Sequence, residues 1–302
     1  MADHPHPAMA DRYRVAIERA VTADLGRPWA VAGCEDLGDR ASHPCAVLRG
    51  DGLDVFVKLD ASGPLRAELA GLRLLTERGG VRTPAAIGPG VIELDDGAVL
   101  LLEAVRTVPP DRDGWRDIGR TLARLHSVTG PRFGLEEQGW FGPFPQDNRP
   151  ASDPSWATFY AERRLRPRLE AALASGHLPA MVGARVEALI DRVPALAGPE
   201  VAPALLHGDA QRNNLLTTAR GTVAIDPAAH FGHPEVDLAL FDHFGPDPGI
   251  DDVLEGYREV RAIDPGFASR RDLWRVFAHL AVVTVDASYL PALTAALDAY
   301  VA

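Results

Sequence analysis

The stretch His207-Gly208-Asp209-Ala210-Gln211-Arg212-Asn213-Asn214 decides the fold, together with Val223-Ala224-Ile225-Asp226 after it. Each stretch borders a short apolar run of the kind that forms a buried strand. Two acids and an amide, Asp209, Asn214 and Asp226, should therefore converge at the ends of paired strands. Phosphoryl transfer from ATP needs a carboxylate that orients the attacking hydroxyl, and oxygen ligands that hold Mg²⁺. The spacing predicts that Asp209 is the catalytic base and that Asn214 and Asp226 are the metal ligands.

A plainer interpretation of the same residues is structural. His207-Gly208-Asp209 would then be a turn, and Asp226 would cap a strand. A three-residue match alone would favour the turn. The whole set, with its spacing and flanking apolar runs, is more specific and favours a kinase.

A lysine ends an earlier apolar strand, Val55-Phe56-Val57-Lys58. Glu68 borders the apolar face of the helix expected after it, where a carboxylate without a cation would be costly. Taken singly, the two are an ordinary strand-end lysine and a solvated helix flank. With the downstream acids present, they predict an ion pair that positions the phosphates of ATP.

Two weaker signals complete the expected nucleotide site. Gly33-Cys34-Glu35-Asp36-Leu37-Gly38 precedes Lys58 where a phosphate-covering loop should lie, although it is not a G-x-G-x-x-G motif. We expect Gly33 and Cys34 to approach the nucleotide there, with Cys34 partly exposed. Leu101-Leu102-Glu103-Ala104-Val105 should form the hinge that recognises adenine through Glu103 and Val105. By itself that run is only a buried strand.

The pattern along the chain predicts an α+β protein with a two-lobed, protein-kinase-like fold. Residues 1–105 should form a nucleotide-binding lobe built on a small antiparallel sheet, and residues 106–302 a mainly helical lobe that binds substrate. Hairpins are expected at 45–59 and 91–102, and a loosely structured loop at 131–154. Helices are expected at 10–25, 64–78, 113–127, 153–174 and 179–196, with a β island at 204–225.

Composition excludes several classes of function. The net charge is −11, which argues against a nucleic-acid partner. Two cysteines are too few for a disulfide framework and fit a reducing cytoplasm. The first ten residues have no apolar core, so they do not read as a signal peptide, and no apolar run approaches the ~20 residues of a membrane span. We therefore expect a cytoplasmic protein that uses ATP and Mg²⁺ on a small molecule.

The chain resembles the fructosamine (ketosamine) kinases, within the aminoglycoside-phosphotransferase-like kinases, over about residues 31–240. The catalytic loop at His207 carries the wider resemblance. The narrower one rests on Ile225-Asp226-Pro227-Ala228-Ala229-His230-Phe231-Gly232-His233-Pro234-Glu235-Val236-Asp237-Leu238-Ala239. It also rests on Trp140-Phe141-Gly142-Pro143-Phe144-Pro145-Gln146-Asp147-Asn148 and the Trp156 helix.

This resemblance implies phosphorylation of a ketosamine sugar hydroxyl, the 3-hydroxyl of a fructosamine or ribulosamine. It implies bracing roles for Asp237 and His207. The family usually has Trp at the position of Gln211 and an aromatic residue at that of His230. Both departures lie near the expected acceptor pocket, so the resemblance supports the phosphoryl donor better than the acceptor. The polar residues expected to contact substrate are Gln146, Asn148, Gln211, His233 and Glu235.

Two alternatives stay open at this point. One is another kinase of the same superfamily, acting on an aminoglycoside, amino sugar or amino alcohol. The other is a non-catalytic nucleotide-binding or scaffold protein. Intact Lys58, Asp209, Asn214 and Asp226 count against the second alternative, because a scaffold needs no such set.

Overall fold

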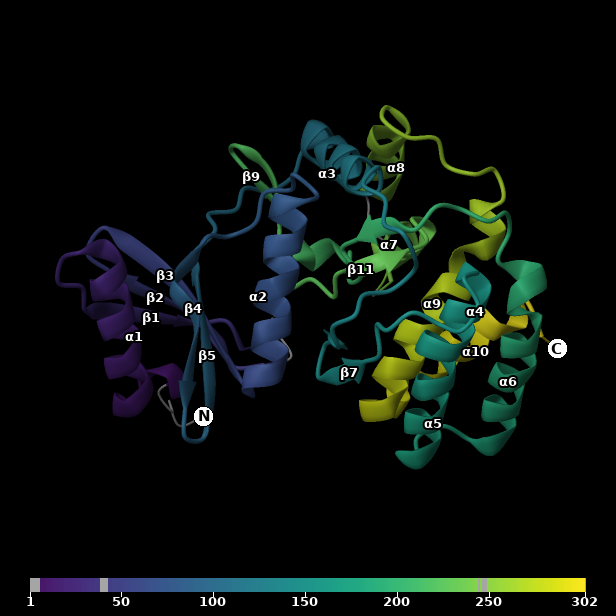
Figure 1. Cartoon of the computed structure of the whole chain (residues 1–302), viewed down its shortest axis with the longest axis horizontal. Coiled ribbons are helices and arrows are strands. Elements are labelled where there is room, and N and C mark those ends of the chain that lie inside the picture. The colour runs from purple at the N-terminus through teal and green to yellow at the C-terminus, as the bar shows by residue number, and fades with distance from the viewer. Residues whose placement is uncertain (1–5, 39–42, 244, 246–248, 302) are drawn as a thin grey trace.

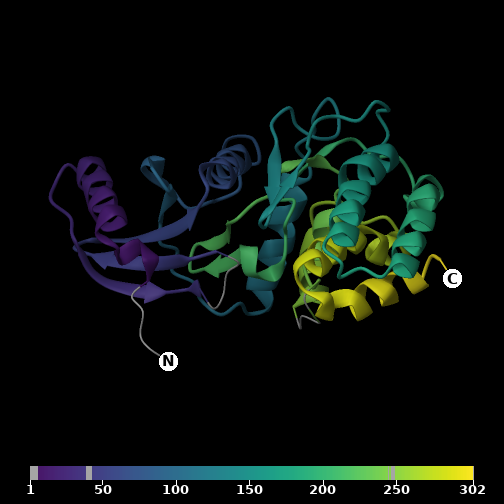
Figure 2. The same cartoon turned by 90° about the horizontal axis from the view of Figure 1, so that it is seen from below.

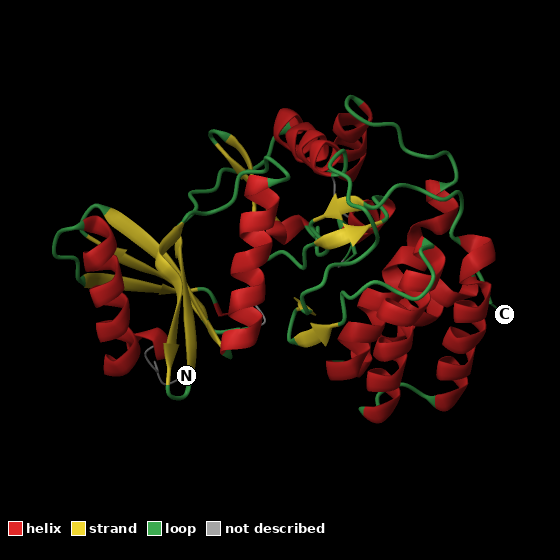
Figure 3. Cartoon of the chain, in the orientation of Figure 1, coloured by secondary structure: helices red, strands yellow, loops and turns green. Residues whose placement is uncertain are grey.

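The computed structural model describes residues 6–38, 43–243, 245 and 249–301. Strands gather in the N-terminal part and helices in the C-terminal part, with α2 (Ser62–Glu77) facing the C-terminal part (Figures 1 and 3). The same two-part arrangement is visible from below (Figure 2). The predicted α+β class is confirmed. No helix among the described residues is long and apolar enough to cross a membrane.

The N-terminal lobe is built on one antiparallel five-stranded sheet with the strand order β1-β2-β3-β5-β4. Successive side chains of β5 point to opposite faces of the sheet, as in any strand. Leu101 packs against α1 (Asp11–Leu25), whereas Leu100 and Leu102 pack against α2. Two helices therefore cover opposite faces of the sheet (Figure 1). The strands are β1 (Val31–Asp36), β2 (Cys45–Gly50), β3 (Leu53–Asp60), β4 (Ala86–Leu94) and β5 (Gly97–Glu103).

The C-terminal lobe contains the largest apolar core, which includes Trp156, Tyr160 and Trp274. The helix expected at 153–174 is present from Trp156 to Ala174, but a π-helical turn, η3 (Ala161–Leu165), interrupts it. The helices are α3 (Arg112–Leu125), α4 (Trp156–Tyr160), α5 (Arg166–Ala174), α6 (Ala180–Leu196), α7 (Glu235–Leu240), α8 (Ile250–Arg258), α9 (Phe267–Val285) and α10 (Leu290–Asp298). Single 3-10 turns are η1 (Pro7–Met9), η4 (Arg212–Asn214) and η5 (Ala287–Tyr289).

Among the described residues, the chain after β5 also forms three two-stranded sheets. β8 (Ala204–Leu206) pairs with β11 (His230–Gly232), and β9 (Leu215–Thr218) pairs with β10 (Gly221–Ala224). The expected β island is therefore present. The segment 131–154, expected to be loosely structured, instead holds a short hairpin of β6 (Gly139–Phe141) and β7 (Phe144–Gln146).

Candidate active site

The loop after β8 is held in one conformation by its backbone. Gly208 has a φ of 82°, and a Cβ atom there would lie 2.1 Å from the carbonyl oxygen of Ala228. Only glycine fits this position without strain. The carboxylate of Asp237 accepts hydrogen bonds from the backbone amides of His207 at 2.7 Å and Gly208 at 2.9 Å. The loop is thus braced immediately before Asp209.

The bracing carboxylate is itself fixed within the core. His126 Nε2 lies 3.0 Å from Asp237 Oδ2, and His126 Nδ1 lies 3.0 Å from the Tyr257 hydroxyl. Burial acts to raise the pKa of Asp237, but His126 and His207 outweigh it and lower that pKa. His207 Nε2 donates to the carbonyl of Ile225 at 2.9 Å and so ties the loop to the strand before Asp226.

Asp209 receives two side-chain hydrogen bonds. Asn214 Nδ2 donates to Asp209 Oδ2 at 3.0 Å, and Gln211 Nε2 donates to the same oxygen at 3.3 Å. Burial and the charge of Asp226 outweigh these donors and raise the pKa of Asp209 to about 7. A carboxylate whose pKa lies near neutral is suited to general-base catalysis.

Lys58 joins the two lobes at the centre of the site. Its Nζ lies 2.9 Å from Glu68 Oε2 and 2.8 Å from Asp226 Oδ1. The predicted Lys58–Glu68 ion pair is therefore present. Burial opposes the charge on Lys58, but the two carboxylates outweigh it and raise its pKa. Burial acts to raise the pKa of Asp226, but Lys58 outweighs it and lowers that pKa. Burial and the charge of Asp226 raise the pKa of Glu68.

The expected magnesium ligands lie where a bound cation could reach them. The side chain of Asp226 is 45% exposed to the cleft. Asn214 uses its amide nitrogen on Asp209, which leaves its oxygen to serve as a ligand. Among the described residues, no cluster of three or more His, Cys, Asp or Glu could hold a metal by itself. A donor set of one carboxylate and one amide instead fits Mg²⁺, which completes its shell with phosphate oxygens and water.

A cleft of about 1530 Å³ opens between the lobes beside these residues. Glu103 and Val105 line it at the end of β5, and Phe56, Asn214 and Asp226 line it farther along. The hinge residues expected from the sequence therefore face the nucleotide-sized cleft. Gln211, which was expected to contact the acceptor, also lines this cleft. It does not line the smaller cavity between α2 and the β6–β7 hairpin that ends at Asp209.

The segment expected to cover the phosphates is mostly strand β1, and its register divides its residues between the two faces. Gly33 pairs with Arg49 and Glu35 with Val47, and Arg49, Glu35 and Val47 all line the cleft. Cys34 pairs with Leu48, which belongs to the core beneath α1. The expectation for Cys34 therefore needs correction, because its side chain lies on the face turned away from the cleft. Residues 39–42 of the following connection lie outside the described part of the chain.

Cys34 nevertheless remains exposed, so a thiol reagent should label it in the folded protein. Partial burial and Asp36 raise its pKa, so labelling should speed up as the pH rises, because the thiolate is the nucleophile. ATP should not slow this labelling. Mass spectrometry of the alkylated protein, with and without ATP, measures both effects. Full protection by ATP would instead place Cys34 in the nucleotide site.

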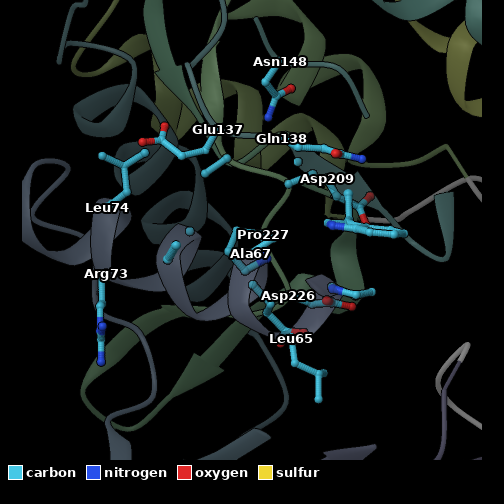
Figure 4. Close-up of a pocket in the computed structure, with 18 of the residues that line it drawn as sticks. Leu65, Ala67, Arg73, Leu74, Glu137, Gln138, Asn148, Asp209, Asp226 and Pro227 are labelled. Carbon is cyan, nitrogen blue, oxygen red and sulfur yellow. The ribbon is translucent and has the colours of Figure 1, made fainter. Parts of the chain in front are cut away.

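A second cavity, of about 410 Å³, lies between α2 and the β6–β7 segment and ends at Asp209 (Figure 4). Asn148 lines it, as the sequence led us to expect, whereas Gln146 is buried behind Asn148 and is not part of the wall. Several polar wall residues could not be predicted from the sequence, because neither motif nor periodicity marks them. These residues are Arg73, Glu77, Glu137 and Gln138.

His233 and Glu235, expected to contact substrate, line neither of these two pockets. Glu235 is buried and bonds Arg270 at 2.5 and 2.9 Å and the Trp274 indole at 2.8 Å. His233 stacks on Trp274, and burial lowers its pKa to about 4. Both residues therefore have structural roles. His230 is also buried, against Phe159, so its departure from the family pattern does not alter the pocket wall.

Trp140 lines the second cavity, whereas Trp156 is buried in the core beside Phe133 and Tyr160. The structure therefore gives the two tryptophans different environments. Figure 4 places Asp209 and Asp226 toward one side of the cavity and Arg73, Leu74 and Glu137 toward the other. The cavity thus has one end at Asp209 and Asp226 and an outer, charged end.

Comparison with protein families identifies the group to which this site belongs. The model for fructosamine kinases matches residues 14–302. A relative named probable ketoamine kinase, from Synechocystis, is 34% identical over 232 residues, which cover 74% of each chain. A second protein of that name, from Pasteurella multocida, is 31% identical over 270 residues, covering 86% of this chain and 89% of its own.

Solved structures agree with these matches. A structure from Thermobifida fusca, provisionally assigned as a fructosamine-3-kinase, has a TM-score of 0.81 and 34% identity, covering 94% of this chain and 98% of its own. The aminoglycoside phosphotransferase APH(4)-Ia aligns over 93% of this chain and 96% of its own with a TM-score of 0.62 and 14% identity, which shows a shared fold. The predicted kinase-like fold is thus confirmed.

Proposed function

The chain belongs to the fructosamine kinase family, and from this premise we propose that it transfers the γ-phosphoryl group of Mg²⁺-ATP to a sugar hydroxyl of a ketosamine. The observation that supports the proposal is that two cavities share the same charged wall residues. Lys58, Glu68 and Asp226 line both the interlobe cleft and the smaller cavity that ends at Asp209. A nucleotide in one and a hydroxyl in the other would face each other across these residues.

Each side chain has a part in this reaction. Asp209 orients the acceptor hydroxyl and accepts its proton, while Lys58, held by Glu68, binds the phosphates. Asp226 and Asn214 would hold Mg²⁺, which neutralises developing charge on the phosphate oxygens when bound. Gln211 stabilises the charged form of Asp209 through its hydrogen bond and lowers the proton affinity that burial raises.

The outer end of the smaller cavity supports a ketosamine as the acceptor. A ketosamine carries a sugar and a secondary amine that is protonated at neutral pH. Glu137 and Arg73 line the outer part of the cavity, and Glu77, which also lines the cavity, lies one helical turn after Arg73 on α2. With the sugar hydroxyls at Asp209, the amine would lie toward these acids. We propose the 3-hydroxyl as the phosphorylated position and the cytoplasm as the location.

A substrate panel tests this proposal. With Mg²⁺-ATP, the protein should phosphorylate fructosyl-lysine or ribulosyl-lysine and show little activity on aminoglycosides. Phosphate transfer is measured by ADP release, and NMR of the product locates the phosphorylated hydroxyl. If the protein turned over aminoglycosides efficiently and no ketosamine at all, the proposed acceptor class would be wrong. The assignment as a phosphotransferase would still hold. Omission of divalent metal should abolish turnover in every case.

A further inference from the structure

The loop that carries Asn148 is held by an unusual pair of buried cations. Arg164 is 3% exposed and Arg168 is 6% exposed. Burial lowers the pKa of Arg164 to about 9 and that of Arg168 to about 10. Within the described part of the chain, neither forms a salt bridge with a carboxylate. A buried guanidinium without a paired carboxylate is costly, so its hydrogen bonds to other groups are needed to offset that cost.

The two arginines hold different groups. Arg168 donates to the carbonyl of Pro145 at 3.2 Å and lies over the Phe144 ring. Arg164 donates to the carbonyl of Asp147 at 2.9 Å and, through its other terminal nitrogen, to Asn148 Oδ1 at 2.7 Å. Arg168 thus fixes only the backbone, whereas Arg164 also fixes a side chain of the acceptor cavity.

That contact determines which way the Asn148 amide points. A guanidinium only donates hydrogen bonds, so the atom facing it must be the amide oxygen. Gln146 Nε2 donates to the same oxygen at 3.3 Å. The amide nitrogen is thereby turned the other way, and Figure 4 shows it directed into the cavity that Asp209 also lines. The orientation of the amide therefore follows from its hydrogen-bond partners.

The amide nitrogen of Asn148 also has a close neighbour. A Cβ atom on Gly139, in β6, would lie 2.3 Å from Asn148 Nδ2. Glycine therefore leaves room for the amide nitrogen beside the cavity. Arg164 itself lies in the π-helical turn η3, and such turns are frequent at functional sites.

Taking the proposed kinase function as given, we infer that Asn148 Nδ2 is a fixed hydrogen-bond donor to an oxygen of the acceptor sugar. We infer also that Arg164 is the positioning residue that sets it. A rigid neutral donor in the cavity that Asp209 also lines selects an acceptor that presents an accepting oxygen at a fixed separation from the hydroxyl to be phosphorylated. A polyhydroxylated sugar chain offers such an arrangement.

Asn148→Asp is the most informative variant. It keeps the shape of the side chain and gives Arg164 a carboxylate partner, so the melting temperature should hold or rise. It also replaces the donor with an acceptor, and the acceptor KM should rise about 10-fold or more, as for a lost buried hydrogen bond. ATP affinity, measured by calorimetry, should stay within about twofold, since Asn148 does not line the nucleotide cleft.

Two further variants change residues that contact the Asn148 amide. Arg164→Gln should raise the acceptor KM, and in combination with Asn148→Ala it should add little, because it acts through Asn148. Gly139→Ala should also raise the acceptor KM by displacing Nδ2. Arg168→Gln is the matched control: it should lower the melting temperature while the acceptor KM stays near wild type.

The assays use the acceptor that the wild-type protein phosphorylates fastest. Equal increases in KM for Arg164→Gln and Arg168→Gln would show that both merely fold the loop and would overturn the inference. An unchanged acceptor KM in Asn148→Asp would also overturn the inference. As long as the wild-type protein phosphorylates a ketosamine, the proposed function would not be affected by that result. A wild-type protein inactive on every acceptor would overturn both.

Discussion

Asp209→Asn should lower kcat by about 10²–10⁴, the usual contribution of a positioned general base. The amide keeps the shape of the carboxylate and can still accept the hydrogen bond from Asn214 Nδ2, so the loop should retain its conformation. ATP affinity should remain near wild type, because Asp209 does not line the nucleotide cleft. The transition state of phosphoryl transfer is loose, so much of the loss would come from misorientation of the hydroxyl.

The same variant should be more stable than the wild type, and the difference should depend on pH. The pKa of Asp209 is raised to about 7, whereas an unfolded Asp has a pKa of about 3.9. The folded state therefore loses stability as the pH rises from about 4 to 7, and the full cost persists above 7. Asparagine removes this cost. The gain in melting temperature should be near zero at pH 4 and largest at pH 7 and above.

Thermal unfolding across this pH range and steady-state kinetics measure the two effects. Asp191→Asn, at an exposed acid of α6, is the control and should change neither. More than a tenth of wild-type turnover in Asp209→Asn would contradict the assignment of the base. A gain in melting temperature that is the same at pH 4 and pH 8 would contradict the raised pKa.

The cluster around Asp209 could be predicted because its residues lie close together in the sequence. Asp209 and Asn214 are five positions apart, and the loop brings Asn214 Nδ2 back to within 3.0 Å of Asp209 Oδ2. Glu68 could be paired with Lys58 from its place beside an apolar helix face. The contact from Lys58 to Asp226 spans 168 positions, and it was not predicted, because Asp226 was expected only as a metal ligand.

The acceptor wall was less predictable, because its polarity depends on partners distant in sequence. His233 and Glu235 carry polar side chains within the family motif, yet they are buried in the C-terminal lobe against Trp274 and Arg270. Glu137 and Gln138 carry no motif and line the cavity only because the following residues form a hairpin. Cys34 was misplaced for a related reason. With β1 predicted as a loop, the alternation that turns Cys34 away from the cleft was not considered.

Asp226→Asn should lower turnover at least about 100-fold, because charge stabilisation by a bound metal is worth several kcal/mol and about 1.4 kcal/mol is tenfold in rate. The Mg²⁺ concentration for half-maximal activity should also rise. Asn214→Ala should weaken Mg²⁺ dependence less, since a neutral amide attracts the cation less than a carboxylate. Activity measured against Mg²⁺ at saturating ATP compares both variants with the wild type.

Asparagine is the informative substitution at this position for a conformational reason. Asp226 has a φ of 50°, a left-handed conformation that asparagine adopts more readily than most other residues. The variant should therefore fold, and Lys58 should keep its contact with Glu68. Removal of the Asp226 charge should lower the pKa of Glu68, which Asp226 and burial together raise.

Lys58 would then have one carboxylate partner fewer and would be freer to bind phosphate. ATP binding without metal should therefore hold or strengthen in Asp226→Asn, while its enhancement by Mg²⁺ disappears. Calorimetric titration of ATP with Mg²⁺ and with EDTA separates these effects from a general loss of folding, which would weaken both. If the Mg²⁺ titrations of Asp226→Asn and Asn214→Ala overlay that of the wild type, the metal binds elsewhere and Asp226 serves only to hold Lys58.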